Sequence, residues 1–272
     1  MIRSLYDNLS KLSILVSSFD KVKDILLIWH KQHIALDLPY KIYYGLNYPD
    51  KDFIKTQSSE FSKRTLYSES YDWCYSLKKW ILQIDSEYIL LLLDDHIIRK
   101  FESKHIEILL TNLKKKNINF SQLTYASNSL SNLHRNDYFL YGELPKGKYS
   151  INLQPSIWEK ELLLKLLKNI ESAWDFEIKS SLKFNTNNSE IKAIFFLSKE
   201  ITFFEQYIER GKYYPNRFNK AINKNLHQFL KREKVTIRRR FISHLGFIYK
   251  VIKEFFKAIK KLKIIKIQQI YF

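Results

Sequence analysis

The sequence has 272 residues, of which 45% are hydrophobic and 15% are aromatic, and it carries a formal net charge of +18. This length fits one α/β domain of roughly 200 to 250 residues with an appendage, and the apolar content excludes wholesale disorder. The single cysteine, Cys74, excludes an internal disulfide and a multi-cysteine metal site. No long apolar run is free of charge, so we expect a cytoplasmic protein without a membrane-spanning helix.

Apolar patterns in the first half predict alternating strands and helices. Residues 12–19 are typical of a buried strand, 20–35 of a helix and 40–46 of a second strand. Together they form a βαβ unit, which opens a parallel sheet with a right-handed crossover. A helix over 69–84 leads into 87–99, which we predict to be one central strand, buried on both faces and polar at its carboxyl end.

The second half has a less regular pattern. The elements expected there are a helix (103–117), an irregular stretch (121–138), a short strand after Lys148, a helix beginning near Pro155 or Ser156, one or two strands (191–208) and a loop (209–218). Strands that alternate with helices in this way favour the α/β class.

A cluster of polar residues, Asp94, Asp95 and His96, follows four leucines in the predicted central strand. Because side chains alternate along a strand, Asp94 and His96 would share one face, while Asp95 points to the other face or into a turn. Acids at the carboxyl end of a parallel strand lie where open α/β sheets bind ligands, and carboxylates can hold the divalent cation that grips a diphosphate. The simpler alternative is a strand end that carries two surface acids.

The segment LLLLDDH resembles the Asp-x-Asp metal-binding motif of GT-A glycosyltransferases. Three further stretches, ILVSSFDKVKDI, LQPSIWEKELLLKLLKNIESAWDFE and ERGKY, are similar in the same order to bacterial members that build lipopolysaccharide and capsule, within residues 12–218. The resemblance implies a GT-A domain over 1–225, with helices on both faces of a mixed, mostly parallel sheet. It also implies transfer of a sugar from a nucleoside diphosphate, expected to be uridine-based, to a lipid-linked oligosaccharide or to a lipopolysaccharide or capsule glycan.

By the same resemblance, the metal would be Mn²⁺ or Mg²⁺ held by Asp95 and Asp94, with no organic cofactor beyond the nucleotide-sugar donor. Members of the family tend to have an aromatic residue after the paired acids, where this chain has His96. His96 would be either a further metal ligand or a hydrogen-bonded strand histidine, and the sequence leaves both open.

The segment ESAWDFE, residues 171–177, places three carboxylates beside two aromatic residues. Direct displacement needs a carboxylate as general base, and apolar neighbours raise the proton affinity of such a group. The segment resembles the region of inverting GT-A enzymes that carries this base at the start of a helix, so we expect Glu177 first and Asp175 second. The alternative is an acid that caps a helix N-terminus. Trp174 would stack on a sugar or belong to the core.

The other candidates for donor binding rest mainly on the resemblance. Short hydroxyls and backbone N–H groups at the end of the first strand suit a ribose, base or phosphate, although Asp20 could instead be an N-cap and no glycine-rich fingerprint is present. Gln154 would face the donor sugar or the acceptor, or simply begin a helix, and Lys212 would neutralise the departing diphosphate from a loop. The full set expected for the nucleotide sugar is Ser17, Ser18, Asp20, Asp94, Gln154, Trp174 and Lys212.

The basic charge is concentrated in a C-terminal tail, residues 226–272. Thirteen lysines and arginines and two acids lie between Lys231 and Phe272, a net of +11. Residues 238–270 have bulky apolar side chains and lysines at helical spacing, which is typical of an amphipathic helix on an anionic membrane surface. We therefore expect peripheral attachment to the cytosolic face of the inner membrane. The alternative is a helix packed on its own domain, whereas nucleic acid fits less well because the apolar stripe would stay unused in a groove.

Two rival functions remain. A nucleotidyltransferase on a related sheet would also need acids and a metal, but we would expect a glycine-rich, basic phosphate loop early in its chain, which is missing here. A non-enzymatic basic protein that binds membrane or nucleic acid would tolerate the loss of Asp94 and Asp95.

Overall fold

The computed structural model covers most of the predicted catalytic domain. The described residues are 11–20, 23–50, 59–123, 134–135, 140–168, 170, 172–186, 189–197, 202–206, 208–209 and 212–213. The tail lies outside them, so its helix and its membrane role stay predictions. Within the described residues, no helix combines the length and the apolar character that crossing a membrane requires.

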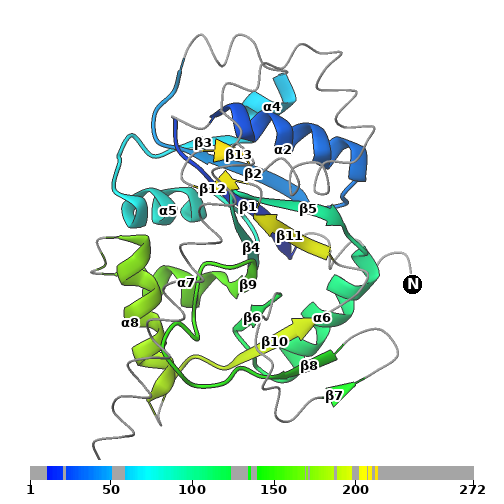
Figure 1. The fold of residues 1–272 in the computed structure, drawn as a ribbon, viewed down its shortest axis with the longest axis vertical. Helices are drawn as coiled ribbons and strands as arrows, with labels where there is room; N and C mark the ends of the chain where they lie inside the picture. The colour runs from blue at the N-terminus through cyan, green and yellow to red at the C-terminus, as the bar shows by residue number, and fades with distance from the viewer. Residues whose placement is uncertain are drawn as a thin grey trace, which may run out of the picture.

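A nine-stranded sheet forms the centre of the described structure (Figure 1). Its order is β3-β2-β1-β4-β9-β6-β10-β8-β7. The strands are β1 (Leu12–Ser17), β2 (Lys41–Leu46), β3 (Thr65–Tyr67), β4 (Tyr88–Leu93), β6 (Phe120–Gln122), β7 (His134–Arg135), β8 (Leu140–Glu143), β9 (Ser156–Glu159) and β10 (Ala193–Leu197). β1 pairs in parallel with β2 and β4, whereas β9 runs antiparallel to both of its neighbours, β4 and β6. The mixed, mostly parallel sheet is therefore confirmed.

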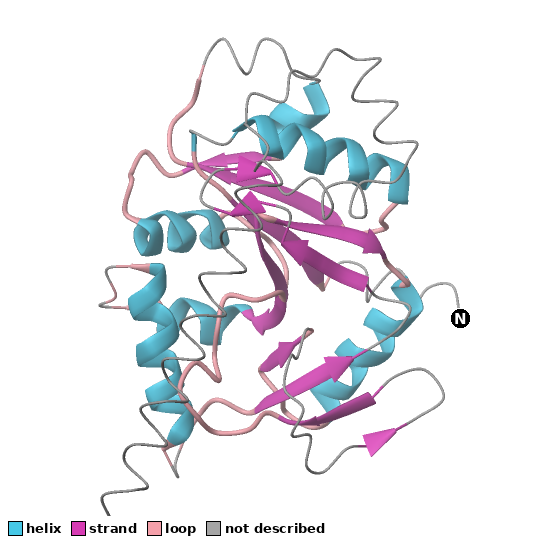
Figure 2. Ribbon diagram, in the orientation of Figure 1, coloured by secondary structure: helices cyan, strands magenta, loops and turns pink. Residues whose placement is uncertain are grey.

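Helices cover both faces of this sheet (Figure 2). Successive residues of β1 and β4 alternate between two buried clusters, as the two-residue period of a strand requires. One cluster contains side chains of α2 (Lys23–Leu36) and α6 (Ser103–Lys115). The other contains side chains of α5 (Trp73–Leu82), α7 (Lys160–Leu166) and α8 (Ala173–Asn185). Burial on both faces explains why β4 is continuously apolar in sequence and why β1 has only small serines among its apolar residues.

The prediction of one strand over 87–99 is wrong. β4 ends at Leu93, Asp94 and Asp95 form a turn, and β5 (His96–Lys100) pairs with β11 (Thr202–Gln206) in a separate two-stranded sheet. Two adjacent carboxylates inside a doubly buried strand would lose their hydration, and aspartate favours turns, so the chain leaves the sheet at this point. Asp94 therefore does not lie in a strand with His96, and the prediction that strand alternation places the two side chains on one face is wrong.

A second correction concerns the region before α7. Residues 148–155 contain no strand, and Ser156 begins β9 rather than a helix; α7 starts four residues later. Ile157 and Trp158 pair with both β4 and β6, and their side chains are fully buried on opposite faces of the sheet, a setting that favours a strand over a helix.

Near the end of the described chain, more residues are in strands than the sequence indicated. The region 191–208 contains β10, β11 and the start of β12 (Ile208–Glu209). β12 pairs with β13 (Lys212–Tyr213), which lies where a loop was predicted. Short α4 (Ser59–Lys63) precedes β3 and was not anticipated.

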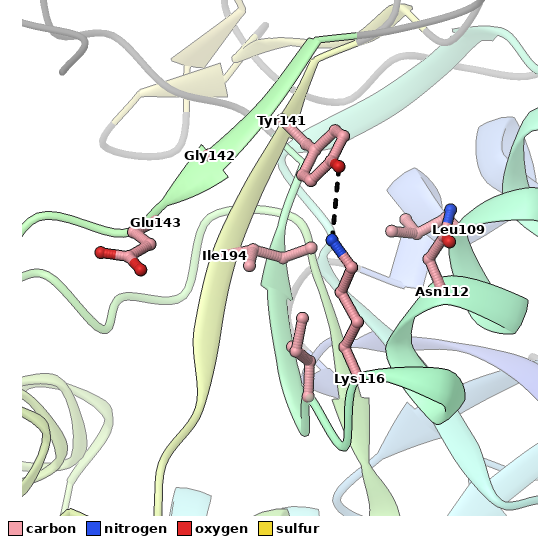
Figure 3. Close-up of a pocket in the computed structure, with 8 residues that line it drawn as sticks. Leu109, Asn112, Lys116, Tyr141, Gly142, Glu143 and Ile194 are labelled. Carbon is pink, nitrogen blue, oxygen red and sulfur yellow. Dashed lines mark hydrogen bonds between the residues drawn. The ribbon is translucent and has the colours of Figure 1, made fainter. Parts of the chain in front are cut away.

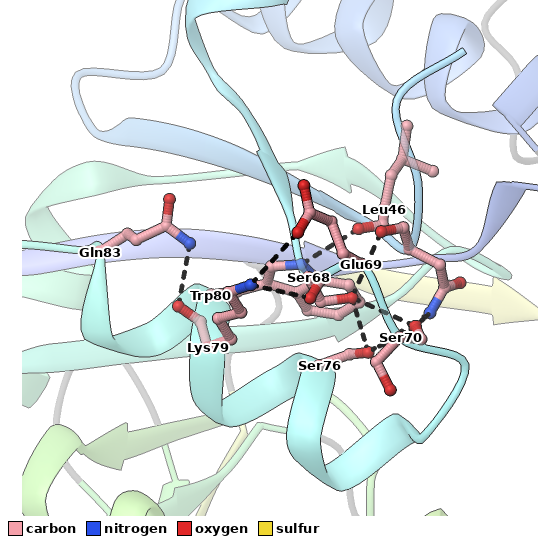
Figure 4. Close-up of polar contacts among 9 residues, drawn as sticks. Leu46, Ser68, Glu69, Ser70, Ser76, Lys79, Trp80 and Gln83 are labelled. Atoms are coloured by element: carbon pink, nitrogen blue, oxygen red, sulfur yellow. Dashed lines mark hydrogen bonds and ion pairs between the residues drawn. The ribbon is translucent and has the colours of Figure 1, made fainter.

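The carboxyl ends of β2 and β3 are fastened to α5 by a polar network (Figure 4). The Trp80 indole donates to the Leu46 carbonyl at 3.2 Å, and Lys79 donates to the Ser68 carbonyl at 3.0 Å. The Trp80 ring also packs directly on Gly45, where a Cβ atom would overlap it. The absent side chain at Gly45 is thus what allows α5 to approach the strand so closely.

Candidate functional site

Sequence-distant polar residues meet at one edge of the sheet. Ser17, at the end of β1, is paired with Gly45 of β2 and with Leu93 of β4, so these three strands end at nearly the same level. Because β9 runs the opposite way, its first residue, Ser156, pairs with Leu91. The segment just before β9 therefore arrives at the same edge, which is where open α/β sheets bind ligands (Figure 1).

Asp94 is positioned by β1 and α2 together. The Ser18 hydroxyl donates to a carboxylate oxygen of Asp94 at 2.8 Å, and the Asp94 N–H donates to the Ser17 carbonyl at 3.2 Å. From α2, the Trp29 indole N–H donates to the Asp94 carbonyl at 3.1 Å. The structure thus brings Ser17, Ser18 and Asp94 together, and the donor-binding role expected of them stays a prediction.

Asp95 and His96 contact each other. The His96 Nδ1 lies 2.9 Å from an Asp95 carboxylate oxygen, and the imidazole is almost completely buried. Gln32 of α2 donates to the Ile98 carbonyl in β5 and helps to fix this segment. No local pattern in the sequence indicates that Trp29 and Gln32 position this segment, because their partners are 65 and 66 residues away.

The donor set for a divalent cation is small. Among the described residues, no three His, Cys, Asp or Glu side chains form a group that could enclose a metal. Mg²⁺ is nevertheless often held in proteins by one or two carboxylates together with substrate phosphates. Asp94 and Asp95 supply two consecutive carboxylates in the turn after β4, which is the number that such an arrangement needs. Their metal ligation, and that of His96, stays a prediction.

Asp20 contacts the segment that follows β2. One carboxylate oxygen accepts the N–H groups of Asn47 at 3.1 Å and Tyr48 at 3.0 Å. This contact ties the end of β1 to the end of β2. Tyr48 in turn packs on Tyr71, with 4.9 Å between ring centroids. The nucleotide role expected of Asp20 stays a prediction.

Three side chains on one face of α8 hold the segment 144–155 in place. One Glu177 carboxylate oxygen accepts the Leu153 N–H at 2.7 Å. Ser181 exchanges two hydrogen bonds of 3.0 Å with the backbone of Ile151, and Asn185 does the same with Gly147. Residues four apart lie above one another on a helix, so these contacts form a ladder along α8.

Glu177 is a partly desolvated carboxylate. Burial raises its pKa above the ordinary value, and the Leu153 N–H opposes this shift because it stabilises the charged form. The preceding residue, Phe176, is fully buried and packs on Trp158 of β9 and on Trp73 of α5, at centroid separations of 5.7 and 5.9 Å. The first turn of α8 is therefore anchored in the core.

Asp175 has a different environment from Glu177. Its backbone N–H is capped by the Ser172 hydroxyl at 3.1 Å, and its carboxylate lies 2.7 Å from the Lys179 ammonium. The cap of α8 is therefore Ser172, and Asp175 is a first-turn acid whose carboxylate pairs with Lys179 instead of a backbone N–H. The catalytic roles expected of Asp175 and Glu177 both stay predictions.

The remaining predicted residues are placed as follows. The Gln154 backbone is held by Asn152 and Ser156, and its side chain is exposed before β9. Trp174 is 64% exposed, so the alternative of a core tryptophan is wrong. Lys212 lies in β13, but its side chain is outside the described part of the structure.

A pocket of about 160 Å³ lies between α6 and the β8–β10 region (Figure 3). Leu109 and Ile194 contribute apolar wall, and the Lys116 ammonium lies 3.3 Å from the Tyr141 hydroxyl and 4.7 Å from the centre of the ring. Ile118, in this lining, precedes β6, so the pocket lies towards the opposite end of that strand from the polar edge. None of the predicted site residues lines it.

The comparisons with known proteins were made on sequence and on structure. No protein-family model and no curated protein matches the sequence. Among solved structures, S. aureus TarS residues 1–349 are 12% identical with a TM-score of 0.46, and the match covers 78% of this chain. A cytidylyltransferase from Leptospira borgpetersenii is 13% identical with a TM-score of 0.47, covering 86% of this chain and 99% of that one. Apo UDP-glucose pyrophosphorylase is 7% identical with a TM-score of 0.46, covering 82% and 99%.

This chain spans 63% of the length of the TarS fragment. All three TM-scores are below 0.5, so these matches assign neither a fold family nor a reaction to this chain.

Proposed function

We propose that the protein transfers a sugar from a nucleoside-diphosphate sugar, with uridine as the expected nucleoside, to a hydroxyl of a lipid-linked or lipopolysaccharide-type glycan. The observation that carries this proposal is the polar edge, where Asp94 hydrogen-bonds to Ser18 at 2.8 Å and Asp95 follows it. Two carboxylates at the carboxyl end of a buried parallel strand suit a site for a metal-bound diphosphate.

In the proposed reaction, Asp94 and Asp95 would hold Mn²⁺ or Mg²⁺. A bound cation would offset the charge that develops on the departing diphosphate. The Ser18 hydroxyl holds the Asp94 carboxylate, and the Trp29 indole of α2 holds the Asp94 carbonyl. Preorganised groups of this kind need no rearrangement when charge develops.

Glu177 is the proposed general base. One of its oxygens holds the Leu153 N–H, which leaves the other to take the proton from the acceptor hydroxyl. The hydroxyl oxygen then forms a bond to the anomeric carbon as the bond from that carbon to the diphosphate breaks, with inversion. Partial burial raises the pKa of Glu177, and a raised proton affinity makes a carboxylate a better base.

The tail would keep the enzyme at its acceptor. Its net charge of +11 and its apolar side chains at helical spacing support binding to anionic lipid at the cytosolic membrane surface. Removal of residues 238–272 is expected to abolish co-sedimentation with vesicles of anionic phospholipid while metal-dependent donor hydrolysis continues. Unchanged sedimentation would contradict the tail proposal and leave the transfer proposal intact.

A thermal-shift panel tests the transfer proposal. At a UDP-sugar concentration of about 100 times Kd, binding should stabilise the fold by about 2.7 kcal/mol, and only with Mn²⁺ present. Asp94→Ala should lose this stabilisation. The matched control is Asp85→Ala, because Asp85 is an exposed aspartate just before the opposite end of β4. Flat melting curves for all nucleotides and nucleotide sugars would count against the proposal.

The same panel separates the rival nucleotidyltransferase. That enzyme would be stabilised by a nucleoside triphosphate and would release pyrophosphate in the presence of a sugar phosphate. The link from β1 to α2, residues 18–22, contains no glycine, which is the observation that favours the glycosyltransferase over this rival.

A further inference from the structure

Trp174 is an exposed aromatic side chain in an ordered setting. It is the second residue of α8, it is 64% exposed, and its ring meets that of Tyr149 edge-on, with 5.4 Å between centroids and 61° between planes. A large aromatic ring that is oriented by another ring and yet open to solvent is suited to stacking on a ligand. The proposed reaction does not by itself assign a role to Tyr149.

The backbone at Tyr149 is held in an unfavourable conformation. Its φ is 61°, in the left-handed region that bulky residues rarely adopt. The neighbouring contacts enforce it: Asn152 donates to the Tyr149 carbonyl at 3.1 Å, and the Ser150 hydroxyl bonds to the carbonyls of Pro145 and Gly147. Residues in such conformations tend to cluster at ligand sites, where the surrounding structure maintains them.

The ring pair lies beside the proposed base. Trp174 precedes Glu177 by three residues, so both project from the same face of α8. Tyr149 belongs to the segment 144–155, whose Leu153 N–H is bound to Glu177 at 2.7 Å. The Lys148 ammonium lies 5.3 Å from the centre of the Tyr149 ring, so Tyr149 has a cation as well as Trp174 as a neighbour. Trp174 is then the more open of the two rings.

We infer that Trp174, oriented by Tyr149, is a stacking platform for the acceptor, and that the acceptor is a pyranose with a continuous apolar C–H face. This inference rests on the proposed function and names the chemical class that its acceptor site takes. A nucleobase could also stack on an indole. The sugar is favoured because the ring lies on α8 with the proposed base, whereas Ser18 and Asp94 belong to the ends of β1 and β4.

Saturation-transfer NMR with methyl β-D-galactopyranoside and methyl β-D-glucopyranoside tests this inference. In the wild type, saturation should reach the C–H protons of one sugar face. The signal should fall about fivefold or more in Trp174→Ala and in Tyr149→Gly, as expected for loss of an aromatic contact. Tyr149→Gly removes the ring and also relieves the left-handed backbone, so it should fold at least as well as the wild type.

Two matched variants serve as controls. Trp174→Phe keeps an aromatic ring and should retain most of the signal. Tyr75→Ala removes an exposed tyrosine of α5 and should change nothing. Equal signals in the wild type and in Trp174→Ala would overturn the inference, as would no signal in any protein. Displacement of the glycosides by free uridine would identify the ring as a nucleobase site and would overturn it too.

The metal-dependent thermal shift with UDP-sugars, recorded on the same variants, separates this inference from the proposed function. Trp174→Ala should keep the shift; loss of the shift would place Trp174 with the donor-binding residues, as expected from the sequence, and would overturn the inference. If the wild type shows the thermal shift with UDP-sugars but no saturation-transfer signal from the glycosides, only the platform inference is contradicted. If the glycoside signal depends on Trp174 but no nucleotide sugar stabilises the protein, the transfer proposal is contradicted and a carbohydrate-binding surface remains.

Discussion

The Asp94 turn and the α8 ladder hold their carboxylates in opposite ways. At the turn, the Asp94 carboxylate accepts a hydrogen bond from the Ser18 hydroxyl, and the backbone of Asp94 is held by the Ser17 carbonyl and the Trp29 indole. On α8, the Glu177 carboxylate is itself the anchor that holds a backbone segment. The turn is thus supported by its surroundings, whereas Glu177 supports its surroundings. Substitutions at Asp94 and at Glu177 should therefore have different relative effects on the rate of transfer and on the stability of the fold.

The largest expected effect is that of Asp94→Ala on transfer. Loss of a metal-binding carboxylate should lower kcat by about a thousandfold or more, because a bound cation contributes several kcal/mol to transition-state stabilisation. The melting temperature should change little, since the backbone contacts of residue 94 remain. Radiolabelled sugar transfer measures the rate, and calorimetry the stability. Ser18→Ala, which removes only the aiming hydroxyl, should have a much smaller effect; an equal loss would mean that Ser18 contacts the donor directly.

Glu177→Gln is expected to lower kcat by about 10² to 10⁴, the usual contribution of a general base. The glutamine carbonyl oxygen can still accept the Leu153 N–H, so the ladder should survive. Ser181→Ala is the matched control: it breaks the next contact along α8, costs about 1 kcal/mol, and leaves the base in place. If the two variants lose activity equally, the carboxylate has only the anchoring role.

Gly45→Ala tests the β2 side of the polar edge. The new methyl group would overlap the Trp80 ring, and overpacking of this kind costs about 1 to 3 kcal/mol. The double variant with Trp80→Leu should recover part of the loss, because the smaller side chain makes room. Chemical denaturation of the three proteins measures this, and additivity of the two single losses would contradict the direct contact.

The smallest effect concerns pH. Burial raises the pKa of Glu177 in the folded state above its ordinary value of 4.5. The protonated side chain therefore stabilises the fold fully below pH 4.5, and this contribution is lost as the pH rises through the folded-state pKa. Over this pH interval, the melting temperature of the wild type should therefore fall relative to that of Glu177→Gln. The rate of transfer should increase over the same interval, because the base must be deprotonated. A parallel melting profile for the two proteins would show that burial does not perturb this carboxylate.

The sequence predicted best where one period governs a whole segment. The βαβ unit followed from two apolar runs with a helical pattern between them, and the burial of β1 and β4 on both faces followed from their mainly apolar sequences. Prediction failed where a polar pair interrupts an apolar run, since Asp94 and Asp95 are compatible with a strand end and with a turn. It failed again at Ser156, because Ile157 and Trp158 pair with β4 and β6, whose residues lie far away in sequence.

The candidate site was only partly accessible to sequence reasoning. Acids that follow a buried strand are visible in the sequence, and so is the group around Trp174. The partners that fix them are not, because the hydrogen bonds of Asp94 to Ser18 and Trp29 span 76 and 65 residues. The left-handed backbone at Tyr149 has no local signal at all, since neither glycine nor asparagine stands there.

The reversed direction of β9 has a consequence for folding. β9 is inserted between β4 and β6, and its pairing of Tyr88 with Glu159 joins residues 71 positions apart. The two outer parts of the sheet are thereby joined through a single short strand. Opening β9 would separate them, so hydrogen exchange at the β9 amides should occur mainly through global unfolding. β9, which follows the segment 144–155 at the polar edge, would then also make the two parts of the sheet unfold together.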